Sequence, residues 1–65
     1  MSRIYELAVK IETSKAWGVY EYDPEDVIWL PKHRVERGRR LKQVGLDWVW
    51  EFRIPEDLAI EKGLE

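Results

Sequence analysis

The chain has 65 residues, no cysteine and a formal net charge of −2. This length predicts one domain spanning 1–65, and the lack of cysteine excludes both a disulfide framework and a thiolate metal site. Because small secreted domains usually depend on such staples, we expect a cytoplasmic protein. No apolar stretch approaches the ~20 residues of a membrane span, and Glu6 interrupts the first residues before a signal-like apolar run can form.

The composition favours a stable, aromatic core. Four Trp, three Tyr and one Phe supply large apolar surfaces to a chain of only 65 residues. Charged residues make up 37%, Asn is absent, and Gln43 and Met1 are the only residues of their types. This mixture is typical of proteins from hot environments, so we expect a thermophilic source.

The first half of the chain predicts three short strands. Apolar residues alternate over 4–12, and an aromatic segment over 16–22 follows a turn, which together indicate a hairpin. Gly18 inside the second segment predicts a bulge or a close approach of the backbone. The sequence Asp23-Pro24-Glu25-Asp26 suits a type I turn. A third strand over 27–30 should end at Pro31, which has no amide proton to donate.

The second half is expected to add one or two strands and a helix. Residues 33–36 fit a brief fourth strand, and 37–40 read as a basic turn or mobile tip. Over 46–54, Leu46, Trp48, Trp50, Phe52 and Ile54 alternate with polar residues, which is the clearest strand signal. A short helix over 56–62 should end at Gly63, with Leu64 as an apolar latch. These elements predict a mainly β fold: an SH3-like or OB-like partly open barrel of four to five antiparallel strands with a short C-terminal helix.

Charge is distributed unevenly along the chain. Residues 32–42 contain six Lys or Arg and one Glu, a net charge of +5, so the remaining residues carry −7. Basic side chains on a hairpin of a small barrel commonly contact phosphates, whereas an alternative reading is a soluble edge that resists aggregation. Exposed aromatic residues on strands can stack on bases. The stripe of Trp48, Trp50 and Phe52 is interpreted as core. Trp17, Trp29, Tyr20 and Tyr22 lie on or beside strands that could offer a stacking face, and Trp29 is the expected stacking residue.

Signals for catalysis are weak. His33 is the only imidazole and is interpreted as an exposed loop residue. The Asp23, Glu25 and Asp26 cluster lacks calcium-loop spacing and is interpreted as a solvated turn. No glycine-rich phosphate loop is present. We therefore expect no enzyme activity, no cofactor and no metal site.

Two segments, W-L-P-K-H-R-V (29–35) and I-P-E-D-L-A-I-E-K-G-L (54–64), resemble small uncharacterised proteins of phages and mobile elements. The resemblance implies a compact β fold and an origin near replication or defence genes, without an established activity. Lys32 occupies the lysine position of that pattern. The stretch 37–42 is more basic than the pattern, and Leu58 stands where relatives often carry Trp followed by Leu.

The leading functional hypothesis is a small nucleic-acid-binding protein that acts on DNA or RNA as a monomer or weak dimer. The alternative is a phage-type interaction module or inhibitor that docks on a larger nucleic-acid-processing enzyme, because a domain with two opposite charge regions suits electrostatic docking. The membrane is not an expected partner. The candidate binding residues are Lys32, Arg34, Arg37, Arg39, Arg40, Lys42 and Trp29.

Overall fold

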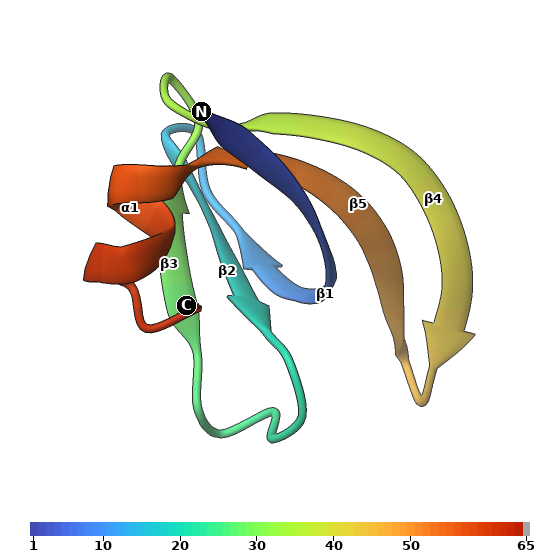
Figure 1. Ribbon diagram of the computed structural model, residues 1–65. Coiled ribbons are helices and arrows are strands. Elements are labelled where there is room, and N and C mark those ends of the chain that lie inside the picture. The colour runs from blue at the N-terminus through green and yellow to red at the C-terminus, as the bar shows by residue number, and fades with distance from the viewer. Residues whose placement is uncertain (65) are drawn as a thin grey trace.

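The computed structural model describes residues 1–64, which form one open antiparallel sheet followed by a short helix (Figure 1). The sheet order is β3-β2-β1-β5-β4. The elements are β1 (Ser2–Glu12), β2 (Ala16–Tyr20), β3 (Ile28–Pro31), β4 (Glu36–Val44), β5 (Asp47–Pro55) and α1 (Glu56–Glu61). The prediction of a mainly β fold with four to five antiparallel strands and a short C-terminal helix is confirmed, and the strands number five. Within 1–64, no helix is long and apolar enough to cross a membrane.

Local chemistry explains most of these boundaries. β1 and β2 form the predicted hairpin, which a β-bulge interrupts between Val9 and Ile11. In the turn after β2, the Asp26 amide donates to the Asp23 carbonyl at 2.9 Å, and the Glu25 amide donates to Asp23 Oδ1 at 2.9 Å. Asp therefore closes this turn with both its backbone and its side chain, as its residue type predicts.

The prediction of a turn or mobile tip over 37–40 is wrong. Residues 36–44 form the continuous strand β4, which pairs along β5 as the second arm of a long hairpin. The reversal lies at Gly45 and Leu46, where Gly45 has φ 62°. A positive φ at the first central position is the geometry of a tight hairpin turn, and glycine adopts it without a steric cost. The predicted brief strand over 33–36 is likewise wrong, because residues 32–34 form a turn and only Glu36 belongs to a strand.

The core lies on one face of the sheet and beneath the helix. Its fully buried members include Leu7, Val19, Leu30, Phe52 and Ile54. The helix closes this face with Leu58 and Ala59, both buried against the same cluster.

The helix ends as the sequence predicts. Gly63 has φ 78° and its amide donates to the Ile60 carbonyl at 3.1 Å, while the Leu64 amide donates to the Ala59 carbonyl at 2.8 Å. This pair of hydrogen bonds is a Schellman motif, and Leu64 packs on the core as its apolar contact.

A smaller apolar cluster covers part of the opposite face. Ala8, Tyr20 and Val49 are buried there from three adjacent strands, with Leu41 packed against them. The Tyr20 hydroxyl donates to Asp47 Oδ2 at 2.7 Å. This hydrogen bond joins β2 to the start of β5 on the face opposite the core, which we call the second face.

The connection between β3 and β4 forces the sheet to curve. These strands are opposite edges of the sheet, yet only residues 32–35 join them. Four strand spacings in a flat sheet span ~19 Å, whereas the five Cα steps of this connection reach at most ~18 Å when fully extended. Because the Arg34 amide also donates to the Pro31 carbonyl at 3.1 Å, the connection is shorter still. The sheet curls accordingly, and buried Val35 fills the interior at this point.

Candidate functional site

The predicted basic residues lie in the β3–β4 connection and along β4, which is an edge strand. Lys32 and Arg34 belong to the connection, and the four others belong to β4. Side chains on a strand alternate between faces. The cluster that is continuous in sequence is therefore divided in space.

Lys32 and Arg37 converge on one carboxylate at the interior face. Lys32 Nζ lies 2.7 Å from Glu12 Oε2, and Arg37 Nη1 lies 3.6 Å from Glu12 Oε1. Both cations also cover the Trp17 ring, with Lys32 Nζ at 5.2 Å and Arg37 Cζ at 5.4 Å from its centroid. The hydrogen bond from Lys32, the charges of Lys32 and Arg37, and a weaker contribution from the Trp17 indole together lower the pKa of Glu12, although desolvation opposes them.

Arg34 is held by the helix. Its Nη2 lies 2.9 Å from Asp57 Oδ2 in the first turn of α1. The hydrogen bond and charge of Arg34 lower the pKa of Asp57, and backbone amides at Asp57 and Leu58 contribute in the same direction. This ion pair joins the β3–β4 connection to α1.

Two arginines on β4 stack on two tryptophans of β5. The Arg37 guanidinium carbon lies 4.2 Å from the Trp50 centroid, and that of Arg40 lies 4.2 Å from the Trp48 centroid. The register pairs Arg37 with Phe52 and Arg40 with Trp50, so each arginine reaches the next tryptophan toward the hairpin turn. Diagonal neighbours are within reach of long side chains, and cation–π attraction favours the contact.

Register shifts on both sides of Arg40 explain how Arg37 and Arg40, which are three residues apart, come to face the same way. The irregularities lie between Arg37 and Arg40 and between Arg40 and Lys42. Bulges redirect side chains and increase local twist. Arg40 consequently faces the tryptophans, whereas Arg39 approaches Glu51 on the other face at 3.7 Å and remains 78% exposed.

Lys42 and Trp29 lie on this second face as well. Lys42 pairs in register with Val49 and lines a hollow of about 290 Å³ together with Glu6, Tyr20 and Tyr22. Trp29 pairs with Gly18, and a Cβ at Gly18 would lie 3.2 Å from the Trp29 ring. The prediction of close backbone approach at Gly18 is confirmed, and Trp29 packs its ring there while remaining 43% exposed.

No family model, curated protein or solved structure matches this chain. The side-chain arrangement on the β4–β5 hairpin is consequently the basis for the function proposed below.

The interpretation of the tryptophan stripe as core holds for only part of β5. Phe52 and Ile54 are fully buried, Trp50 is half-buried, and Trp48 is 36% exposed. Leu46 is 96% exposed because it lies in the turn rather than in the strand. Sequence reasoning therefore missed Trp48 as a surface residue. Placing the turn at Gly45 would have aligned Trp48 with Gln43, but the register shifts that bring Arg40 to Trp48 could not be read from the sequence.

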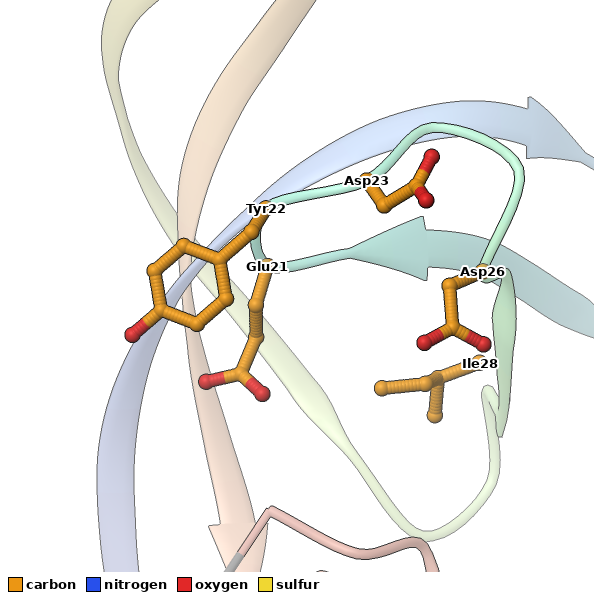
Figure 2. Close-up of a pocket in the computed structure, with 5 residues that line it drawn as sticks. All are labelled: Glu21, Tyr22, Asp23, Asp26 and Ile28. Atoms are coloured by element: carbon orange, nitrogen blue, oxygen red, sulfur yellow. The ribbon is translucent and has the colours of Figure 1, made fainter.

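The acidic turn surrounds a shallow hollow of about 90 Å³ (Figure 2). Glu21, Asp23 and Asp26 line it with Tyr22 and Ile28, and Tyr22 is 91% exposed. Among residues 1–64, no three His, Cys, Asp or Glu side chains are arranged to hold a metal ion. His33 is exposed at the other end of β3, beside Lys32.

Proposed function

We propose that this chain is a small nucleic-acid-binding protein, without catalytic activity, whose contact surface is the β4–β5 hairpin. The observation that supports the proposal is the cationic edge formed by Arg39, Arg40 and Lys42. Within the part of the chain that the structure describes, Arg40 and Lys42 have no ion-pair partner, and the Arg39 pair is long at 3.7 Å. Cations that lack tight partners can neutralise phosphates at little cost.

The remaining basic residues are less suited to this role. Lys32, Arg34 and Arg37 already contact carboxylates and contribute to the internal contacts of the fold. A phosphate would have to compete with those carboxylates. We therefore expect about three phosphate contacts, rather than the six that the sequence cluster alone would supply.

The test is a salt titration. Binding of labelled single-stranded DNA, duplex DNA and RNA is followed by anisotropy between about 25 and 200 mM salt. Three phosphate contacts predict a log–log slope of roughly −2 to −3, from about 0.7–0.9 per contact. Replacing Arg39, Arg40 and Lys42 with Glu should abolish binding.

The matched control replaces Lys10, Lys15 and Lys62 with Glu. It makes the same change in net charge away from β4, and we expect it to weaken binding much less. Equal losses for both triple variants would show that net charge alone drives binding. That result would contradict the assignment of the surface to β4.

A second candidate function is docking on a larger nucleic-acid-processing protein. It is favoured by apolar exposure at the hairpin end, where Val44, Leu46 and Trp48 are 44%, 96% and 36% exposed. Trp and Arg are also the residue types that dominate protein interfaces. Copurification of a stoichiometric protein partner, together with no affinity for any nucleic acid at low salt, would establish this function instead.

A further inference from the structure

The interior face of the β4–β5 hairpin is the face that carries Phe52 in the core, and it becomes exposed toward the hairpin turn. Three different polar or aromatic groups lie side by side there. Trp48 is 36% exposed, the Arg40 guanidinium carbon lies 4.2 Å from its centroid, and Gln43 pairs with Trp48 in register. Register partners on antiparallel strands place their side chains on the same face. Gln43 is the only amide side chain in the sequence, because the chain contains no Asn.

Each of these groups has a matching feature in an unpaired base. An aromatic ring and a guanidinium plane both stack on bases. An amide can donate to and accept from a base edge, because it carries both an N–H donor and a carbonyl acceptor. The cation also attracts the phosphate that accompanies the base.

Arg37 and Arg40 differ in their freedom to contact a ligand. Arg37 lies over both Trp17 and Trp50 and contacts Glu12, so three groups of the protein already hold its guanidinium. Arg40 lies over one ring and has no ion-pair partner within residues 1–64. The pair formed by Arg40 and Trp48 is consequently the one that remains available at the surface.

Resting on the function proposed above, we propose that the ligand is a single-stranded nucleic acid, with a base stacked on the Trp48–Arg40 pair and Gln43 at its edge. In a duplex, neighbouring base pairs cover the base faces, so stacking would require unpairing. A single strand exposes these faces without that cost. Base stacking therefore favours a single strand, whereas the cationic edge alone would bind either a single strand or a duplex.

The same geometry argues against Trp29, the stacking residue expected from sequence. Trp29 lies on the face opposite Arg37 and Arg40, next to Gly18. It pairs in register with Gly18, whereas Trp48 lies directly beside Arg40. A base stacked on Trp29 would be remote from the stacked arginines.

The experiment compares two probes of equal length, a twelve-residue oligothymidylate and an abasic oligodeoxynucleotide. The ratio of their affinities isolates the base contribution, because both carry the same phosphates. We expect the native protein to prefer the base-bearing probe by about fivefold or more, which corresponds to a stacking energy of at least about 1 kcal/mol per base. It should also bind this probe more tightly than a duplex of twelve base pairs.

Two matched pairs of variants identify the residues that produce the preference for the base-bearing probe. Trp48→Leu and Arg40→Gln should bring the affinity ratio close to one. Arg39→Gln removes a neighbouring cation from the other face, so it should weaken both probes equally and preserve the ratio. Trp29→Leu removes a ring that is at least as exposed as that of Trp48 and should also preserve the ratio.

The outcomes separate this inference from the proposed function. Equal affinity for the duplex and the single strand would overturn the inference alone. The same holds if Trp29→Leu lowers the ratio of base-bearing to abasic affinity and Trp48→Leu does not. If the native protein binds none of the probes, both the inference and the proposed function are overturned. Thermal unfolding confirms that each variant is folded, and the Arg40→Gln and Arg39→Gln pair decides the question if Trp48→Leu fails to fold.

Discussion

The four tryptophans show how one residue type serves different purposes in different environments. Trp17 is buried and packs edge-on against Phe52, with their ring centroids 5.3 Å apart. Its Nε1 is buried, and no group among residues 1–64 makes a hydrogen bond of good geometry with it. Trp50 is half-buried beneath Arg37, and Trp48 and Trp29 are exposed on opposite faces. Among the aromatic residues of β5, exposure therefore increases stepwise from Phe52 through Trp50 to Trp48.

The Glu12 carboxylate should make stability depend on pH. Lys32 and Arg37 lower the pKa of Glu12 in the folded state. The stabilisation that ionised Glu12 gives the fold is therefore complete above its unfolded-state pKa and is lost as pH falls through the lowered folded-state value. Urea unfolding between pH 2 and 7 should show a shallower acid dependence for Glu12→Gln than for the native chain. Exposed Glu61→Gln on α1 is the control and should retain the native profile. Parallel profiles for all three proteins would contradict the prediction.

Tyr20 provides a second test at the scale of single residues. Its hydroxyl donates to Asp47, and that hydrogen bond, burial and the nearby negative charge together raise its pKa. Tyr20→Phe should lower the free energy of unfolding by about 1 kcal/mol, as is typical for loss of one hydrogen bond. The double variant with Asp47→Asn should show little further loss. Additive losses would mean that the two side chains act independently.

At the scale of elements, β4 shows where sequence patterns are insufficient. β1 and β5 show an alternation of apolar residues, and β2 and β3 are short apolar segments next to turn residues, so all four strands could be predicted. Six of the nine residues of β4 are charged or glycine, and only Leu41 and Val44 are apolar. An edge strand with polar residues on both faces has no hydrophobic period, and its structure depends on pairing with β5.

The candidate site, like the strands of the fold, was predictable only in part. The sequence identified the cations but could not assign their faces, because two register shifts around Arg40 change the alternation. It also could not show that Glu12 and Asp57, which are distant in sequence, form ion pairs with three of them. Gly18 and Gly63 were predictable because a close approach and a helix end impose local requirements on glycine.

The helix should depend mainly on Leu58 for its docking on the sheet. α1 has six residues, which is too few for an isolated helix to persist in water. Leu58 is 2% exposed, so Leu58→Ala should cost about 2–5 kcal/mol of unfolding free energy, measured by urea titration. Ile60→Ala, 58% exposed on the same helix, should cost far less. Similar losses for the two variants would show that α1 is not anchored through Leu58.

At the scale of the whole molecule, the two sheet edges are protected in different ways. β3 is only four residues long and ends in Pro31, which cannot donate a hydrogen bond. β4 is longer, but its register shifts and cations oppose pairing with another copy. In a β4–β4 contact, the arginines of the two copies would repel one another.

We therefore expect a monomer at about 100 µM in sedimentation experiments. Replacing Arg39, Arg40 and Lys42 with Thr removes the repulsion and adds residues that favour strands. This variant should associate in a concentration-dependent manner. A native chain that sediments as a dimer would show that the cations of β4 do not prevent edge pairing.

The short connection over 32–35 has a consequence for how such a protein can diversify. Curvature that is imposed by the length of the backbone does not require particular side chains on the hairpin, which projects away from α1 (Figure 1). Substitutions at the hairpin surface can therefore accumulate without flattening the sheet. An insertion in the connection would have the opposite effect, since it would relax the architecture while leaving every binding residue in place. Ligand preference and overall shape are thus free to evolve independently in this chain.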